Sequence, residues 1–357
     1  MRILSLIDCL LTGGGQHIMF NIIRGLPEYR HKVAYLYPTE TDGAMKQMLA
    51  DYGLPVELVD PSIENYWPQY AQADDERLAK ALTRVINEFK PHVVLRHFWA
   101  GRETAGRKLP LPRPRFLRPV PKYVCIIHDF YPAPEGYDFY VPTSKDNDVS
   151  YQTHIPPSQK KVIYNGVDVA AFDNPKTPHK GFIIGRAATL FEKKIPADFI
   201  DFAAAFDIPN VKFVFAGEGG RRAEFEKRAA ELGISDKFEF LGAVDYYNIP
   251  QVLSRFDISC YLTDTHVETF SMAMIEKAVA GVVVVAEPRG SLPEQIIHGK
   301  TGFLSNDRRE IKRYCELLFK EPSLLAEMSE AARKFGRQFT IFRQAEQYRE
   351  IIQKLCG

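Results

Sequence analysis

The most informative stretch of this 357-residue chain reads His266-Val267-Glu268-Thr269-Phe270-Ser271-Met272-Ala273-Met274-Ile275-Glu276-Lys277-Ala278-Val279-Ala280-Gly281. The pattern predicts a helix that begins near Ser271 and ends at Gly281, since glycine commonly follows the last helical residue. Glu268 then lies in the loop before the helix, and Glu276 lies within its second turn. The stretch therefore places two carboxylates around one helix N-terminus.

This arrangement suggests the chemistry of a ligand. The N–H groups of Phe270, Ser271 and Met272 at the helix start form an anion site. Carboxylates beside such a site repel phosphate, so Glu268 and Glu276 are expected to bind hydroxyl groups instead. A sugar nucleotide, with a diphosphate between two polyhydroxyl groups, meets both requirements. The alternative interpretation makes Glu268 a partner of the helix dipole and Glu276 a solvated helix residue.

Short β-rich apolar runs alternate with helical patterns over nearly the whole chain, which is typical of βα units around parallel sheets. The expected strands cover residues 2–7, 32–37, 56–59, 92–96, 123–127 and 139–141, and then 182–184, 212–216, 237–241, 258–262 and 282–286. The expected helices cover residues 16–25, 43–52 and 74–89, and then 197–206, 222–232, 247–254 and 271–280. Two such series predict an α/β protein with two doubly wound domains.

The join between the domains is expected near residues 165–180. Asn165-Gly166 is a turn signal there, and a stretch rich in helix and strand breakers follows it. We therefore expect a first domain over residues 1–168 and a second over residues 169–339. The last helix, in residues 340–357, is expected to cross back onto the first domain.

Composition and charge exclude several classes of protein. The 46 Lys and Arg residues nearly balance the 45 Asp and Glu residues, so no chain-wide field attracts nucleic acid. The five cysteines form no CxxC pair, which argues against a disulfide framework or a zinc site. No apolar run approaches the roughly 18 residues that a membrane span needs. We expect a cytoplasmic protein.

Two further segments allow two interpretations each. The glycines of Thr12-Gly13-Gly14-Gly15-Gln16 suit either a phosphate contact or a tight turn. They lack the GxGxxG fingerprint of a dinucleotide dehydrogenase. Residues 101–122 carry seven basic residues, one acid and five prolines, which predict a surface loop. This loop is either a solvated linker or a peripheral contact with an anionic acceptor or the inner membrane face.

The acids Glu268 and Glu276 resemble the E-x7-E pattern of retaining GT-B glycosyltransferases of the GT4-like family, the glycosyl transferases group 1. Phe270 matches the aromatic residue of that pattern. Other segments are similar to further motifs of the family: Asn165-Gly166-Val167-Asp168, Ala216-Gly217-Glu218-Gly219, Phe240-Leu241-Gly242, Arg289-Gly290-Ser291-Leu292-Pro293-Glu294 and Gly299-Lys300-Thr301-Gly302-Phe303. The chain departs from the family at Thr269, Ser271 and Ser291, and Ser291 with Glu294 also spells a capping box.

The resemblance implies a GT-B fold, in which two Rossmann-like domains face each other across a cleft. It implies that Glu276 binds the nucleotide ribose and Glu268 the donor sugar. The implied diphosphate ligands are Arg186, Lys194 (with Lys193 as the alternative) and the amides of Phe270, Ser271 and Met272. Gly13, Gly14 and Gly217 are implied in donor binding, and His128 is the implied active-site histidine after the strand at 123–127. His97 and Trp99, after the preceding strand, either line the acceptor side or form a packed pair, and the packed pair is the preferred interpretation.

The function that the resemblance implies is retaining sugar transfer from a nucleoside diphosphate donor, with UDP-sugars favoured. The acceptor is a glycan, a lipid-linked molecule or a small molecule. No cofactor or metal is expected, because Asp146-Asn147-Asp148, the nearest spelling of an Asp-x-Asp metal motif, suits a helix start better. The alternatives are a sugar-nucleotide epimerase, a glucan phosphorylase and a non-catalytic sugar-nucleotide-binding subunit.

Overall fold

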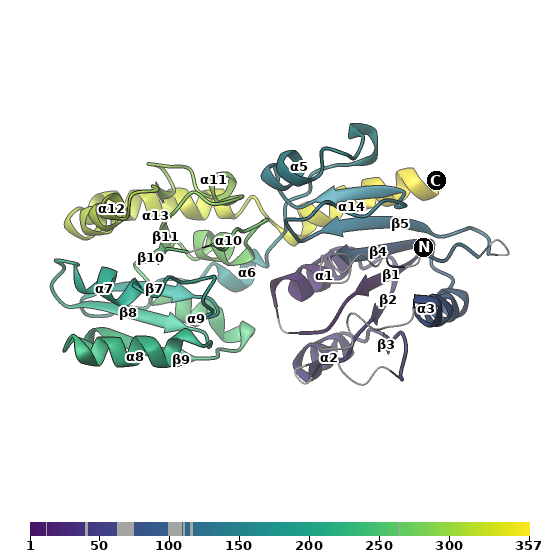
Figure 1. Cartoon of the computed structure of the whole chain (residues 1–357). Coiled ribbons are helices and arrows are strands. Elements are labelled where there is room, and N and C mark those ends of the chain that lie inside the picture. Colours follow the sequence, from purple (N-terminus) through teal and green to yellow (C-terminus); the bar gives the residue numbers. More distant parts are fainter. Residues whose placement is uncertain are drawn as a thin grey trace. The chain divides into compact units, whose positions relative to one another are not determined.

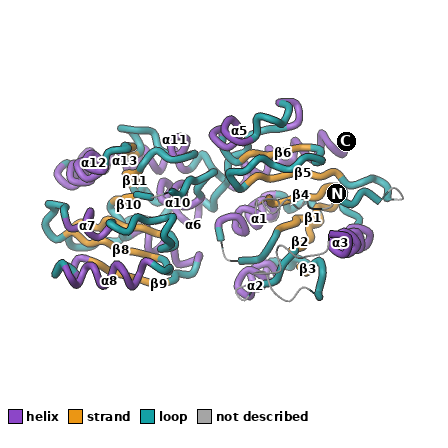
Figure 2. The backbone as a smooth tube through the Cα atoms, viewed as in Figure 1, coloured by secondary structure: helices purple, strands orange, loops and turns teal. Residues whose placement is uncertain are grey.

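The chain divides into two compact units, which the computed structural model describes over residues 1–11, 13–39, 42–62, 75–98, 109, 111–114, 117–263 and 265–357. The first unit contains Met1–Gly166 and Ile341–Gly357, and the second contains Val167–Thr340. The expected boundaries at 168/169 and 339/340 lie close to these. Figure 1 shows the order of the elements along the chain, and Figure 2 shows helices alternating with strands in both units.

The first unit is built on a six-stranded parallel sheet with the order β3-β2-β1-β4-β5-β6. Strands β1, β4 and β5 are buried along nearly their whole length, and each reads as an apolar run because helices cover both faces of such sheets. The strands are β1 (Arg2–Ile7), β2 (Arg30–Tyr35), β3 (Val56–Leu58), β4 (Val93–Phe98), β5 (Lys122–Ile127) and β6 (Phe139–Pro142). The helices are α1 (Gly14–Gly25), α2 (Asp42–Asp51), α3 (Asp75–Phe89), α5 (Lys145–Tyr151) and α14 (Ile341–Cys356).

The second unit repeats this plan with the strand order β12-β11-β10-β7-β8-β9. Its strands are β7 (Phe182–Ala187), β8 (Val211–Ala216), β9 (Phe238–Gly242), β10 (Ile258–Tyr261), β11 (Val283–Ala286) and β12 (Gly302–Leu304). Its helices are α6 (Val169–Phe172), α7 (Phe199–Ala204), α8 (Arg221–Glu231), α9 (Ile249–Ser254), α10 (Met272–Val279), α11 (Leu292–Gln295), α12 (Arg308–Lys320) and α13 (Pro322–Gly336).

Both sheets have a point at which the strand order reverses, between β1 and β4 in the first unit and between β7 and β10 in the second. Open parallel sheets bind ligands at such points, outside the carboxyl ends of the strands. The expected α/β fold with two doubly wound domains is therefore confirmed, and the topology marks one candidate edge in each unit.

The last helix, α14, packs in the first unit against α1. Gly25 makes this close packing possible, because a Cβ atom there would lie 2.4 Å from the Cβ of Ala345. At the unit boundary, Gln344 accepts a hydrogen bond from the Gly166 amide at 3.0 Å. The chain thus leaves the first unit at Gly166 and returns to it at Ile341.

The core of the second unit is rich in phenylalanine on the side of the sheet that α7 and α8 cover. The rings of Phe199 and Phe215 lie 5.5 Å apart, and Phe225 of α8 is fully buried beside them. Full burial of each such ring stabilises the fold by about 1.5–3 kcal/mol. This packing gives a firm support for the loops at the carboxyl ends of β7 and β8.

Candidate functional site

Glu268 lies half-buried in the loop that joins β10 to α10. Its Oε1 accepts hydrogen bonds from the Tyr261 hydroxyl at 3.0 Å and from His266 Nε2 at 2.9 Å. Burial alone would raise the pKa of this carboxyl, but the His266 hydrogen bond and the positive charge of Lys194 lower the pKa to about 2. Glu268 is therefore an ionised hydrogen-bond acceptor at neutral pH.

The backbone of Glu268 is fixed by the loop before α11. Its carbonyl oxygen accepts from the Ser291 amide at 2.9 Å and from the Ser291 hydroxyl at 2.8 Å. Gly290 has a φ of 53°, and a Cβ there would lie 2.6 Å from the Glu268 oxygen. The capping-box interpretation of Ser291 is thus wrong: within the described residues its side chain makes no helix cap, and it holds Glu268 instead.

The start of α10 corrects part of the predicted anion site. The Ser271 amide donates to Gln295 Oε1 at 3.1 Å, and the Ser271 carbonyl accepts from Gln295 Nε2 at 2.7 Å. Gln295, which the sequence did not single out, therefore occupies one of the three amides expected to bind phosphate. Phe270 packs against Phe339 with ring centroids 5.6 Å apart, and α10 begins at Met272. Of the three predicted amides, that of Ser271 is thus paired within the protein, and Met272 is the first helical residue.

Glu276 lies inside the second unit, so the interpretation of it as a solvated helix residue is wrong. Its side chain is buried, and its Oε1 accepts a hydrogen bond from the Tyr246 hydroxyl at 3.0 Å. Burial raises the pKa of Glu276 to about 7. The two acids of the motif thus differ in protonation, because Glu268 has several hydrogen-bond donors and cations around it and Glu276 has fewer.

Arg186 is fully buried at the end of β7. Its guanidinium donates to the carbonyl oxygens of Leu262, at 3.0 Å, and Lys194, and it stacks on the Tyr261 ring at 4.4 Å. Burial lowers the pKa of Arg186 from its ordinary value. The sequence did not predict that this arginine also ties the 190–195 loop to the end of β10.

Lys194, rather than Lys193, lies close enough to influence Glu268. The charge of Lys194 acts on Glu268, whereas the Lys193 side chain is exposed. The Lys193 carbonyl is held by the His266 amide and the Thr263 hydroxyl, both at 3.1 Å. These bonds fix the loop so that Lys194, half-buried, stands beside the Glu268 loop.

Gly217, predicted to bind the donor, has a structural role. Its φ is 153°, and a Cβ there would lie 2.1 Å from the Ala188 carbonyl oxygen. Its amide donates to the Gly242 carbonyl at 2.8 Å. Only glycine permits this approach of the loops after β7 and β8.

In the first unit, the predicted residues lie at the carboxyl edge of the sheet. Gly13 is the N-cap of α1 and Gly14 is its first residue, directly after β1. His128 follows β5, and its Nε2 lies 3.1 Å from Nδ1 of the buried His97 in β4. Burial lowers the pKa of His128 to about 3 and that of His97 well below its ordinary value, so the histidine pair is neutral. His97 thus pairs with His128; Trp99 lies outside the described residues.

A buried ion pair beside these histidines was missed from the sequence. Arg96 and Asp8 are both buried, and Arg96 Nη2 lies 2.5 Å from Asp8 Oδ1. Arg96 Nη1 also donates to the His97 carbonyl at 2.8 Å. The sequence did hold a signal for this pair: Asp8 and Arg96 are charged residues near the ends of two apolar strands. The ends of neighbouring strands bring such residues together.

The other predicted segments can be placed in part. Half of the residues of the basic loop at 101–122 lie outside the described residues, and Arg113 of that loop pairs with Asp138 at 2.8 Å. The helix-start interpretation of Asp146-Asn147-Asp148 is confirmed, since Ser144 caps α5 through the Asn147 amide. Within the described ranges, no helix is long and apolar enough to cross a membrane, and no cluster of three metal-ligating side chains occurs.

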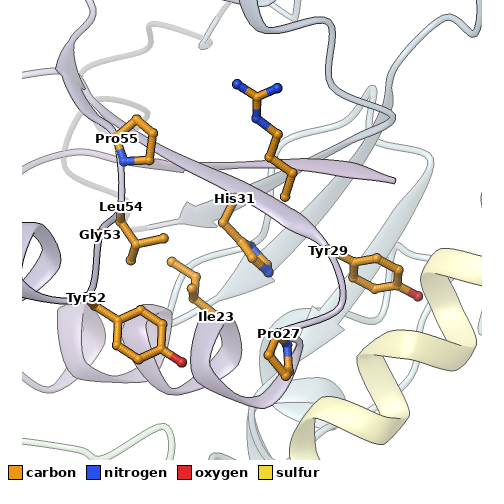
Figure 3. Close-up of a pocket in the computed structure, with 9 residues that line it drawn as sticks. Ile23, Pro27, Tyr29, His31, Tyr52, Gly53, Leu54 and Pro55 are labelled. Carbon is orange, nitrogen blue, oxygen red and sulfur yellow. The ribbon is translucent and has the colours of Figure 1, made fainter.

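A cavity of about 360 Å³ lies away from both edges, at the amino ends of β2 and β3. Figure 3 shows His31 among the side chains of Ile23, Pro27 and Leu54, with Tyr29 and Tyr52 farther out. His31 Nε2 is 2.8 Å from the Leu26 carbonyl. None of the predicted site residues lines this cavity.

Residues 169–335 match the model of the family described as glycosyl transferases group 1. The chain is 30% identical over 181 residues to the Vi polysaccharide biosynthesis protein VipC/TviE of Salmonella typhi, covering 44% of this chain and 30% of that protein. It is 28% identical over 153 residues to N-acetyl-alpha-D-glucosaminyl L-malate synthase of Bacillus anthracis, covering 42% and 39%. The chain thus spans less than half the length of these two relatives.

Two solved structures resemble the whole chain. Anabaena Alr3699/HepE in complex with UDP-glucose has a TM-score of 0.79 at 20% identity, covering 99% of this chain and 100% of that one. Sucrose-phosphate synthase from Thermosynechococcus elongatus has a TM-score of 0.78 at 14% identity, covering 99% of each chain. Together with the two parallel sheets, these similarities show the GT-B fold.

Proposed function

We propose that this protein transfers a sugar from a nucleoside diphosphate donor to an acceptor with retention of anomeric configuration. Its residues 169–335 match the model of the glycosyl transferases group 1 family. The observation that carries the proposal is the pair of acids around the start of α10. Glu268 is ionised and beside Lys194, and Glu276 is buried in the second turn of α10. UDP-sugars are the favoured donors, because the solved structure of HepE contains UDP-glucose.

The donor is proposed to lie along the second unit with its ribose at Glu276 and its sugar at Glu268. The Tyr246 hydroxyl donates a hydrogen bond to one oxygen of the Glu276 carboxyl, and the ribose hydroxyls would donate to the same carboxyl. Glu268 is held in place through both its side chain and its backbone, so it can accept hydrogen bonds from sugar hydroxyls without rearrangement.

We propose that transfer needs no divalent metal. The diphosphate gathers negative charge as the glycosidic bond breaks, and this charge must be offset in the transition state. Lys194, the buried charge of Arg186 and the N-terminus of α10 would supply the positive potential. These groups are fixed before the reaction, because the guanidinium ties the loop that carries Lys194.

His128 is proposed to hydrogen-bond the donor sugar near its anomeric carbon. Its position after β5 is the edge at which parallel sheets bind ligands. As a neutral imidazole it can hydrogen-bond a sugar hydroxyl without repelling the positive charge that develops on the sugar ring. The acceptor is proposed to be a glycan, a lipid-linked molecule or a small molecule, since one relative is named for polysaccharide biosynthesis and another for L-malate.

Glu276→Gln and Glu268→Gln should separate the two ends of the donor. Glu276→Gln should weaken free UDP and intact donor alike, by about 10- to 100-fold, because a carboxyl acceptor of ribose hydroxyls is lost. Glu268→Gln should leave free UDP binding unchanged and lower transfer, because Glu268 is expected to contact only the sugar. Isothermal titration calorimetry with UDP and an initial-rate assay give the two readouts.

Glu327→Gln, on an exposed position of α13, serves as the matched control and should change neither quantity. Equal loss of UDP affinity in the Glu268 and Glu276 variants would refute this division of roles.

A further inference from the structure

Lys277 is the residue after Glu276 on α10, and its side chain is fully buried. Its Nζ reaches back toward the helix start, where it donates to the Ala273 carbonyl at 3.4 Å. This hydrogen bond is long. The ammonium has three N–H donors, and within the described residues this is its one hydrogen bond. The fold therefore buries an ammonium and satisfies it poorly.

The charges around Lys277 make this position costly in the free protein. Arg186 and Lys194 repel the ammonium, whereas Glu276 and Glu268 attract it. Glu268 already accepts bonds from Tyr261 and His266, and Glu276 accepts one from Tyr246.

An anion beside the start of α10 would remove each of these penalties. It would give the ammonium of Lys277 further acceptors, offset the repulsion among three cations and complement the helix N-terminus. The groups point to an anion with several oxygen acceptors, since a single carboxylate would not serve all of them. A diphosphate has that form.

We propose that Lys277 is a third cation of the diphosphate site, binding the phosphate oxygens of the donor together with Lys194. This inference rests on the proposed function of the second unit. Lys277 would also stabilise the nucleoside diphosphate as a leaving group, because the negative charge on its oxygens grows during transfer. The sequence alone suggested no such role, because a lysine beside Glu276 on a helix resembles a solvated residue.

Lys277→Met tests the proposal with a side chain of similar length and no charge. UDP should bind about 10- to 100-fold more weakly, the usual effect of losing a charged hydrogen bond. Binding of uridine, which has no phosphate, should not change. Lys227→Met, at an exposed lysine on α8, is the matched control and should bind both ligands like the unaltered protein.

Two further readouts distinguish a phosphate contact from a packing role. Lys277→Met should raise the thermal unfolding temperature of the ligand-free protein, because an unpaired buried charge is replaced by an apolar group. Burial lowers the pKa of Lys277 to about 8. UDP should raise that pKa, so binding at pH 8.5 should take up about half a proton or more in the unaltered protein and none in Lys277→Met. Calorimetry in buffers of different ionisation enthalpy measures this uptake.

The outcomes separate this inference from the function on which it rests. If the unaltered protein binds none of UDP, GDP and ADP, the proposed function fails and Lys277 has no diphosphate to bind. If the unaltered protein binds UDP and Lys277→Met binds it equally well, the role of Lys277 alone is refuted. Equal weakening of uridine and UDP, or a lower unfolding temperature of the variant, would also overturn it.

Discussion

His128→Ala should lower the turnover number for sugar transfer by about two to four orders of magnitude, the range for a positioned polar catalytic group. His128 stands at the end of β5, and its imidazole is held by His97 at 3.1 Å. Its pKa of about 3 keeps it neutral through the physiological range. Alanine removes the hydrogen-bonding group and leaves the sugar with one contact fewer as positive charge develops.

UDP binding should survive in His128→Ala, because the ribose is proposed to bind at Glu276 and the diphosphate at Lys194 and Lys277, all in the second unit. His92→Gln, at the opposite end of the strands in the same unit, is a suitable control. A turnover number of the His128→Ala variant within a factor of a few of that of the unaltered protein would show that His128 has no catalytic role.

Arg186→Ala should reduce kcat/KM by about three orders of magnitude, as is typical when an arginine that offsets phosphate charge is removed. The variant loses a buried positive charge and also releases the carbonyls of Leu262 and Lys194. Added Mg²⁺ should not restore activity, because the variant lacks the guanidinium that holds the loop carrying Lys194.

Part of that loss is structural, since two carbonyls are left without a buried donor. Lys194→Met isolates the electrostatic part, because Arg186 bonds the backbone of Lys194 and not its side chain. This variant should keep its unfolding temperature and bind UDP about 10-fold more weakly or worse. Nearly unaltered kcat/KM in both variants would contradict the proposed clamp.

The fold could be predicted because its signals are local. Apolar runs bounded by glycine and separated by helical patterns gave two doubly wound sheets, and the helix after Glu268 begins at Met272 as expected within one residue. The short strand Gly302–Leu304 is absent from the expected strands, since three residues show no periodicity. The helices α12 and α13 were not assigned, although both are amphipathic.

The site could be predicted only in its sequence-adjacent part. Glu268 and Glu276 belong to one pattern, and the sequence placed them around one helix start. Contacts between distant segments were out of reach: Gln295 occupies the Ser271 amide, and Ser291 holds the Glu268 carbonyl. Burial of charged residues could not be predicted either, because nothing in the sequence shows that Lys277 has no access to solvent.

The most direct test of the central claim is proton NMR of donor turnover in excess EDTA. UDP-, GDP- and ADP-sugars would be supplied in turn, with a mixture of nitrophenyl glycosides as acceptors. We predict release of UDP and an early product with the same anomeric configuration as the donor. An inverted product, an isomerised donor with no UDP released, or activity that EDTA abolishes and Mg²⁺ or Mn²⁺ restores would contradict the account.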